Sequence, residues 1–406
     1  MRCNFSWRIT FAVLLATILP NGNGHASPTL KEAVESAWAK HPVAQSRAAR
    51  LVEAAAKREL AASWLADAPR VSISQKTDRW NQNAGANEWE AEIGVPLQMP
   101  GVRAARGVLA ESEAIRYDAH AAAEKWRVAG EVREAYWSAR LDASDLALAT
   151  RKVAEASALS TDVERRFKVG EIARTDWNQA QAALKLAESA EADSRAKAFR
   201  STRAVLALTA LPQLPVDDES RRDGKTSIAI EQHPQLRELL LDAEVARARQ
   251  QEANATGQDA PEIAFGAVRE RLAFGEAAAG SVVLRLTVPL PSGARNRSRV
   301  SLAGAERIEA ESRVTQMRLR IEGDIASTIE DLSQAARQVE FAQMRAALAR
   351  ETHMLLDKAY RLGELDLQAR LRAEADRFDA ELSLARANLH RSRSISRINQ
   401  ATGLLP

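Results

Sequence analysis

The chain repeats one series of turn residues about 192 positions further along, in the same order. Pro and Gly residues fix the direction of the backbone, so a series that keeps its order and spacing indicates two copies of one structural unit. The fold must therefore use this unit twice. The repeated segments are His41-Pro42 and His233-Pro234, Val95-Pro96-Leu97 and Val288-Pro289-Leu290, and Phe167-Lys168-Val169-Gly170-Glu171 and Tyr360-Arg361-Leu362-Gly363-Glu364.

The N-terminal segment, residues 1–26, is expected to be a secretory signal peptide. Arg2 and Arg8 give it a basic start, and its apolar stretch Ile9–Leu19 has 11 residues, where a membrane-spanning helix needs about 20. An uncleaved membrane anchor is the alternative. The single cysteine, Cys3, lies in this segment, so the exported chain is expected to have no disulfide and no thiolate metal site.

The repeat divides the chain into two copies, residues 27–211 and 229–406, joined by a linker at 212–228. Each copy is expected to contain a helix, a β-hairpin and a long helical hairpin, in that order. The first helices are expected at about Pro28–Leu65 and Pro234–Ala255, the β-hairpins at about 69–97 and 261–290, and the helical hairpins at about 101–208 and 293–400.

The β-hairpins alternate apolar and polar residues along their strands, so that each strand has one apolar face. In an exported protein this pattern is typical of a transmembrane β-barrel, and a half-buried sheet packed on helices is the alternative. Four strands cannot close a barrel, which needs about eight, so several chains would have to contribute. The clearest apolar positions are Trp89, Ala91, Ile93, Val95 and Leu97 in the first hairpin and Val282, Leu284, Leu286, Val288 and Leu290 in the second.

The polar faces of these strands would line the channel of such a barrel. They carry Glu88, Glu90 and Glu92 in the first hairpin and Arg285 in the second. Rings of acidic side chains favour cations, so these residues are candidates for the lining of a cation pathway. Solvated charges on a wet surface are the alternative.

The long helical stretches run from Gly101 to about Phe167 and from Gly293 to about Tyr360 without a proline. Helices of this length would reach roughly 100 Å, which exceeds the core of any globular domain. Gly170 and Gly363 fit a turn at the far end of each helix. Coiled-coil spacing is expected at Ile321, Ile325, Ile329, Leu332, Ala336 and Val339.

With the duplication, the two hairpins and the two glycine turns, the chain resembles the TolC-type outer-membrane efflux proteins over essentially its whole exported length. The segment Pro96–Arg106 (PLQMPGVRAAR) is most similar to the CzcC-type components of heavy-metal cation efflux. The resemblance implies a fold that is mainly α with a membrane β-barrel. It implies a homotrimer whose three chains form a 12-stranded β-barrel in the outer membrane and a long α-helical barrel in the periplasm of a Gram-negative bacterium.

The resemblance also implies partners and site residues. A periplasmic adaptor would contact the helical tips and connect the channel to an inner-membrane pump of the resistance–nodulation–division (RND) class. The candidate gate residues are Asp176 and Asp366, with Ala369 at the place equivalent to Asp176 in the second copy and Arg370 displaced from the position of the family's arginine. The candidate docking residues are Phe167, Val169, Gly170, Tyr360, Leu362 and Gly363.

No catalytic, cofactor-binding or dedicated metal-binding motif is present in the sequence, so we expect a channel and not an enzyme. The 57 basic and 54 acidic residues are interspersed, and they give no indication of a nucleic-acid partner. Heavy-metal cations of the Co, Zn, Cd and Ni class are the expected cargo. The alternatives are export of drugs or other small organic molecules and, in another class, a periplasmic coiled-coil scaffold or adaptor.

Overall fold

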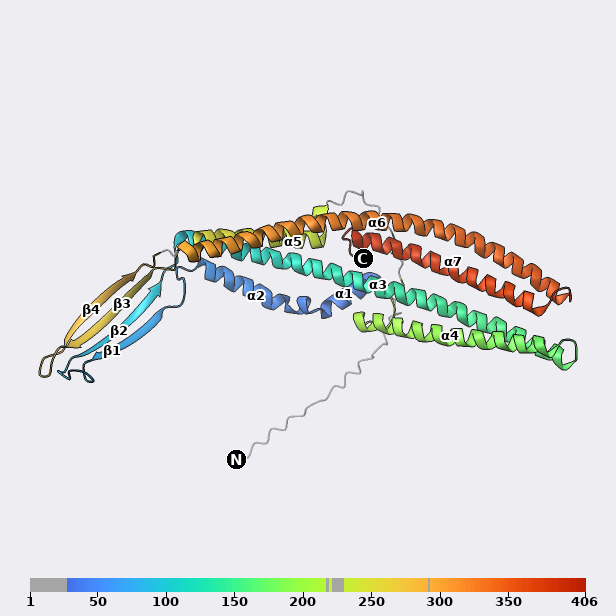
Figure 1. The fold of residues 1–406 in the computed structure, drawn as a ribbon, viewed down its shortest axis with the longest axis horizontal. Coiled ribbons are helices and arrows are strands. Elements are labelled where there is room, and N and C mark those ends of the chain that lie inside the picture. Colours follow the sequence, from blue (N-terminus) through green and yellow to red (C-terminus); the bar gives the residue numbers. More distant parts are fainter. Residues whose placement is uncertain (1–27, 217–218, 221–229, 291–292) are drawn as a thin grey trace, which may run out of the picture.

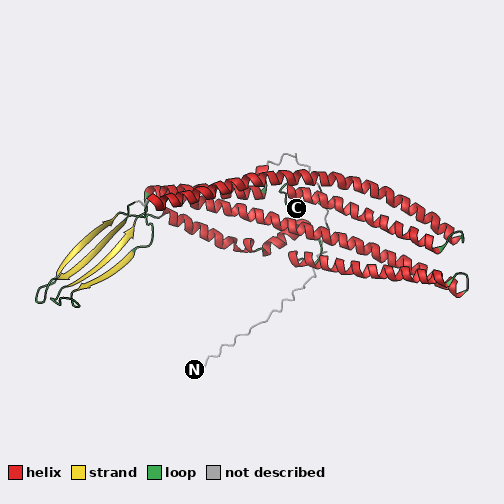
Figure 2. Ribbon diagram, in the orientation of Figure 1, coloured by secondary structure: helices red, strands yellow, loops and turns green. Residues whose placement is uncertain are grey.

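A computed structural model describes residues 28–216, 219–220, 230–290 and 293–406. The expected signal peptide and parts of the expected linker lie outside the described residues. The molecule is elongated, with a small sheet at one end, two helix–turn–helix tips at the other, and long helices between them (Figures 1 and 2). It is therefore mainly helical with one small antiparallel sheet, as expected from the sequence.

The helix expected at about Pro28–Leu65 is two helices, α1 (Leu30–Lys40) and α2 (Pro42–Ala62), so that expectation was wrong. The break falls at His41, which is extended because the residue before a proline is disfavoured in the helical conformation. In the second copy a 3-10 turn, η1 (Ile230–Gln232), comes before the single helix α5 (Pro234–Ala255). The His-Pro pair therefore starts a helix in both copies.

Each copy continues into a helical hairpin whose first helix has 69 residues, about 100 Å at the usual helical rise. The first hairpin packs α3 against α4, and the second packs α6 against α7. Helix α3 also contacts α7, so the two hairpins lie side by side in the order α4–α3–α7–α6 (Figure 1). The helices are α3 (Pro100–Lys168), α4 (Arg174–Thr209), α6 (Gly293–Arg361) and α7 (Leu367–Ala401).

The buried side of α6 differs from the expected coiled-coil seam at two positions. Ile329 and Ala336 are exposed, whereas their neighbours Thr328 and Ala335 face the packed side. The seam thus steps through residues 321, 325, 328, 332, 335 and 339, an alternation of four and three residues, as knobs-into-holes packing requires. Apolar character alone predicts the wrong residues at two positions of the seam, because small or polar residues occupy these positions.

One antiparallel sheet contains all four strands in the order β1–β2–β3–β4. Each hairpin pairs its own strands, and β2 pairs with β3, so the two copies join edge to edge in a continuous sheet. Helices pack beside one another beyond the end of the sheet and leave both of its faces uncovered (Figure 1). The strands are β1 (Arg70–Thr77), β2 (Asn87–Pro96), β3 (Glu262–Arg271) and β4 (Ala279–Thr287).

The largest buried apolar cluster lies midway along the molecule, where α1 packs on α3. Tyr136 and Trp137 of α3 are buried there against Leu30, Ala33 and Val34 of α1. Leu208, Leu211 and Leu405 pack at its margin, so the ends of α4 and of the chain are held at the same level. This cluster anchors the two copies to each other.

His233 lies near this region and is buried with its ring edge against Trp126, at 4.9 Å between ring centroids. Burial lowers the pKa of His233 to about 4, although the charge of Asp324 opposes the shift. In the unfolded chain the pKa returns to about 6.5, so between these pH values the unfolded state binds more protons. Protonation therefore favours unfolding, and the stabilisation present above pH 6.5 is lost as the pH falls towards 4.

Acidification from pH 7 to pH 4 should lower the free energy of unfolding of both the wild type and the His233→Gln variant. We expect the decrease to be about 3 kcal/mol larger for the wild type. Glutamine removes the titrating group and keeps a side chain of similar size. Urea unfolding of both proteins at the two pH values measures the difference. Parallel pH dependences of wild type and variant would contradict a buried, neutral His233.

Candidate membrane sheet and helical tips

The sheet exposes its apolar face. Its strand register aligns Val71, Ile93, Phe265 and Leu284 across all four strands. Phe265 and Leu284 are 63% and 73% exposed, and the other two are exposed as well. A sheet in water buries such a face, so this row of large apolar side chains calls for an apolar environment around the sheet.

The opposite face of the sheet is polar, and its charged side chains partly cover one another. Glu92 is only 8% exposed, and Arg285 of β4 makes ion pairs of 2.8 Å with both Glu90 and Glu92 of β2. Glu88 lies 3.8 Å from Lys76. The structure therefore brings together the four residues named as candidates for a channel lining, with the single arginine set against two of the three glutamates.

The two helical tips have the same turn. Gly170 and Gly363 have φ of +82° and +78°, a left-handed conformation that glycine adopts without strain. The N–H of each glycine donates to the carbonyl of the aromatic residue three positions earlier, Phe167 or Tyr360, at 3.0 Å. Such turns satisfy carbonyl groups at the ends of helices, which explains why the tip sequence recurs in both copies.

The candidate docking residues fall into two groups. Val169 and Leu362 are 66% and 65% exposed at the two tips, where they can contact another protein. Phe167 instead stacks on Trp177 of α4, at 5.5 Å between ring centroids and 7° between ring planes. The exposed apolar side chains are therefore those of the valine and the leucine, one per tip.

Tyr360 packs in an apolar cluster that both hairpins share. Leu159 and Val163 of α3, Ala180 of α4 and Leu367 of α7 are its buried members. The two tips of one chain thus pack together just behind their turns.

The candidate gate residues Asp176 and Asp366 have different surroundings. Asp366 is the N-cap of α7, and its carboxylate accepts a hydrogen bond of 2.8 Å from the N–H of Ala369. Asp176 lies in the first turn of α4, where the helix dipole stabilises a negatively charged side chain. It has no ion pair among the described residues. Helix capping by Asp366 explains why an aspartate stands at that position.

The sequence did not reveal an ion-pair cluster behind the second tip. Arg370 of α7 donates to Asp357 of α6 at 2.6 Å and to Glu374 at 3.0 Å, and its guanidinium lies 5.6 Å from the centre of the Tyr360 ring. Burial is the largest single influence on Asp357 and raises its pKa, but the hydrogen bond and charge of Arg370, together with the charge of Arg361, outweigh burial and lower the pKa of Asp357. Arg361 also pairs with Asp357, at 2.8 Å. The displaced arginine therefore holds the two helices of its own hairpin together.

A second ion-pair cluster lies further from the tips, between α3, α6 and α7. Glu381 of α7 is buried and pairs with Arg350 of α6 at 2.8 Å and with Arg151 of α3. Burial raises the pKa of the neighbouring Glu374, although Arg370 opposes the shift. The pairs Asp357–Arg361, Arg370–Glu374 and Arg377–Glu381 have four-residue spacing and could have been suspected from sequence, whereas the other contacts join distant segments.

Within the described ranges, no group of three or more His, Cys, Asp and Glu side chains could hold a metal ion.

None of the helices that the structure describes combines the length and apolar character needed to cross a membrane.

Comparison with known proteins gives matches to solved structures only. No protein-family model matches the chain, and no curated protein matches it significantly. The Campylobacter jejuni CmeC outer membrane channel has a TM-score of 0.75 at 16% identity, with 93% of this chain and 86% of that chain covered. At such low identity the match establishes a shared fold.

Two further outer-membrane proteins have the same fold. The Vibrio cholerae outer membrane protein VceC has a TM-score of 0.72 at 17% identity, with 92% of this chain and 96% of that chain covered. The Neisseria gonorrhoeae MtrE outer membrane channel, solved in its open state, has a TM-score of 0.72 at 16% identity, with 93% and 90% covered. The likeness covers the sheet and the helices together, so the chain has the fold of these outer-membrane proteins along nearly its whole length.

Proposed function

We propose that this chain is the outer-membrane channel component of a tripartite RND-type efflux system and passively exports heavy-metal cations. It works as a homotrimer in the outer membrane of a Gram-negative bacterium and extends into the periplasm. The exposed tips dock a periplasmic adaptor, which connects the channel to the inner-membrane pump. The observation that carries the proposal is the four-stranded sheet with its apolar face outward, at the end of helices about 100 Å long.

Lipid would cover the apolar face of the sheet, but it cannot form hydrogen bonds with the unpaired backbone N–H and C=O groups at the open strand edges. The outer edges of β1 and β4 have no partner strand among the described residues. Pairing of β1 with β4 of the next copy would satisfy both edges, and three copies would give a closed barrel of twelve strands. The strand count therefore requires more than one chain, and the trimer is the assembly that the resemblance to the efflux proteins implies.

The outermost helices support the same assembly. Helix α6 exposes Phe341, Leu348 and Leu355, which recur every seven residues along one stripe. Helix α4, at the opposite edge of the four-helix layer, exposes Leu186 and Phe199. Packing of α6 against α4 of the next copy would cover both edges head to tail and close a ring of helices.

The charge on the polar face of the sheet supports a cationic cargo. The register places five acidic side chains on this face and three basic ones, which leaves the face negative. Three copies would triple this charge around one pathway, and a negative lining favours cations. The acidic residues are Glu88, Glu90, Glu92, Glu262 and Glu270, and the basic ones are Arg70, Lys76 and Arg285.

Deletion of the gene should lower tolerance to cobalt, zinc, cadmium or nickel, and the intact gene should restore it. Growth of the deletion strain across a concentration series of each metal and of common drugs measures the cargo. Unchanged metal tolerance together with increased drug sensitivity would overturn the metal cargo. Recovery of the protein in the soluble periplasmic fraction would instead overturn the channel and favour a scaffold.

A charge placed on the apolar face should prevent insertion into the membrane. We expect Leu284→Arg to abolish assembly in the outer membrane, because an arginine on the lipid face costs about 2–4 kcal/mol at the membrane centre, and a trimer contains three copies. Val283→Arg, one residue away on the polar face, is the matched control and should assemble normally. Heat-modifiable migration of outer-membrane extracts measures assembly, and equal behaviour of the two variants would contradict the assigned lipid face.

A further inference from the structure

Both long helices begin, next to the sheet, with arginine residues and without an acidic residue. Neither α3 nor α6 has an acidic side chain in its first turn, and the first acidic residues of the two helices are Glu111 and Glu306. The helix dipole favours acidic side chains at this end of a helix and disfavours cations. Helix stability therefore does not explain these arginines, which are Arg103 and Arg106 in α3 and Arg295, Arg297 and Arg299 in α6.

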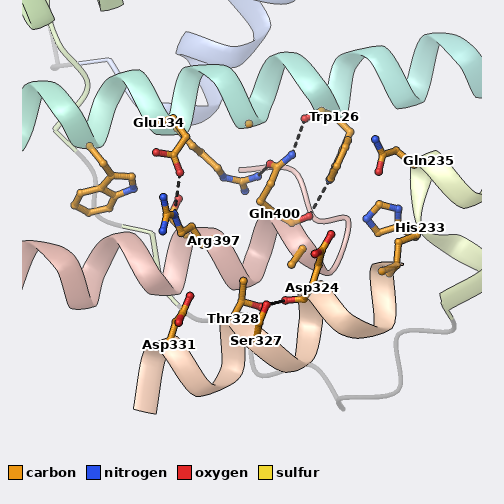
Figure 3. Close-up of a pocket in the computed structure, with 16 residues that line it drawn as sticks. Trp126, Glu134, His233, Gln235, Asp324, Ser327, Thr328, Asp331, Arg397 and Gln400 are labelled. Atoms are coloured by element: carbon orange, nitrogen blue, oxygen red, sulfur yellow. Dashed lines mark hydrogen bonds and ion pairs between the residues drawn. The ribbon is translucent and has the colours of Figure 1, made fainter. Parts of the chain in front are cut away.

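Most of these arginines lack an acidic partner. Arg106 pairs with Glu252 at 3.1 Å, but Arg103, Arg297 and Arg299 have no ion pair with any described residue. Arg295 lies 3.6 Å from Asp259, and both side chains of this pair are at least 70% exposed. Midway along the molecule, by contrast, Arg397 pairs with Glu134 at 3.0 Å (Figure 3). The helical end of the sheet therefore has an excess of positive charge.

These arginines lie just beyond the proposed lipid face. Strand β2 ends three residues before α3 begins, and the apolar pattern of β4 continues to Leu290, which is 87% exposed. A bilayer has a hydrocarbon core of about 30 Å and measures about 40–45 Å with its headgroups, so each headgroup layer is about 5–8 Å thick. One helical turn rises about 5.4 Å. The first turns of α3 and α6 therefore lie at the level of the lipid headgroups when the sheet spans the core.

The spacing of the arginines in α6 places charge on both sides of the helix. Arg295 and Arg299 are four residues apart and share a face, whereas Arg297 is rotated from each of them by about 200°. Arg297 and Arg295 are exposed, and Arg299 is half-buried. Whichever side of α6 faces the lipid therefore carries at least one arginine.

In α3 an exposed tryptophan accompanies the arginine. The guanidinium of Arg103 lies 4.2 Å from the centre of the Trp64 ring, and Trp64 is 66% exposed. Tryptophan is enriched where a membrane meets water. Stacking on the ring leaves the N–H edge of the guanidinium free to bind a phosphate with two hydrogen bonds. The two side chains border a groove of about 360 Å³ between α2 and α3, which is otherwise lined mainly by small residues.

We propose that Arg103, Arg295, Arg297 and Arg299 form a collar that binds the headgroups of acidic phospholipids. The guanidinium groups contact the phosphates, and the excess positive charge selects headgroups with a net negative charge over zwitterionic ones. The collar rests on the proposed insertion of the sheet into a membrane. It fixes the height at which the long helices leave that membrane.

Quenching of tryptophan fluorescence by brominated lipids tests the collar. The full-length protein is reconstituted in phosphatidylcholine vesicles that contain an equal fraction of either brominated phosphatidylcholine or brominated phosphatidylglycerol. The wild type should associate with phosphatidylglycerol at least about fivefold more strongly, the effect of one arginine near an anionic surface. Because the attraction is electrostatic, about 0.5 M NaCl should remove most of this preference. A preference that salt leaves unchanged would overturn the proposal.

Substitutions assign the preference to the collar. Arg297→Gln together with Arg299→Gln should lower the preference for phosphatidylglycerol at least about fivefold. Arg320→Gln together with Arg345→Gln is the matched control, because it removes the same charge from exposed positions of α6 that have no ion pair with a described residue and lie farther from the sheet. The control should keep the wild-type preference, and heat-modifiable migration shows that each variant is folded.

The outcomes separate the collar from the channel itself. Equal association of the wild type with both lipids would overturn the collar and leave membrane insertion intact. An equal loss of preference in the two double variants would also overturn the collar, because the lipid would then respond to overall charge only. Absence of quenching by either lipid would instead overturn the proposed outer-membrane channel, and the collar with it.

Discussion

Replacement of both tip glycines by valine should abolish efflux and leave the trimer assembled in the outer membrane. Gly170 and Gly363 have φ near +80°, and a β-branched residue is a genuine outlier in this conformation. Each substitution would strain its turn by at least about 1–2 kcal/mol. This strain would distort the tips and move the exposed apolar side chains of Val169 and Leu362. The long helices and the sheet lie far from the substitutions and should be unaffected.

Two matched variants separate tip geometry from a general effect of larger side chains. Asparagine tolerates positive φ, so Gly170→Asn with Gly363→Asn should retain most of the efflux. Gly107 and Gly323 lie inside α3 and α6 with ordinary φ and open space around them, so valine at both should preserve efflux. Metal tolerance and crosslinking to the adaptor give the readout. Normal efflux in the valine tip variant would show that the tips do not dock a partner.

Loss of the Arg133 side chain should destabilise the protein by about 3–5 kcal/mol. Arg133 is 3% exposed, and its guanidinium contacts both oxygens of Glu219 at distances from 2.7 to 3.2 Å. It also donates to the carbonyl of Leu404 at 3.0 Å and to the side chain of Gln400. One arginine thus joins α3, the segment between the copies and the C-terminal end. Arg133→Ala would leave the largely buried carboxylate of Glu219 with the hydrogen bond from Ser396 but without its ion pair.

An exposed ion pair supplies the control for this prediction. Arg386 donates to Asp145 at 2.7 Å, but its side chain is about half exposed, so Arg386→Ala should cost less than about 1 kcal/mol. The double variant Arg133→Met with Glu219→Leu removes both buried charges and should recover much of the loss. Urea unfolding of the detergent-solubilised proteins measures all three. A loss below about 1 kcal/mol in Arg133→Ala would contradict the assigned clamp.

The sequence predicted the elements of the fold well because each has a strong local signal. The alternation in β2 and β4, the uninterrupted helical stretches and the turn glycines lie close to the observed strands, helices and turns. The break at His41 also had a local cause, the following proline, and the repeat itself pointed to it, since His233 precedes a helix start.

Other features depend on contacts between distant segments, which the sequence does not display. Thr328 and Ala335 occupy the packed face of α6 because α7 approaches on that side, whereas Ile329 is more apolar and is exposed. Similarly, the pair of Arg370 and Asp357 forms across the tip of a helical hairpin. Trp137 and His233 line one cavity although 96 residues separate them. Residue type limits what such positions can do, but only the fold decides which of them meet.

The equal lengths of α3 and α6, 69 residues each, bear on how such a chain can evolve. An insertion of seven residues in one of these helices alone would move its tip about 10 Å beyond the other. The six turns of a trimer would then end on two levels, and a flat partner surface could reach only three of them. Insertions and deletions in these helices should therefore be tolerated only in matched pairs, one in each half of the chain.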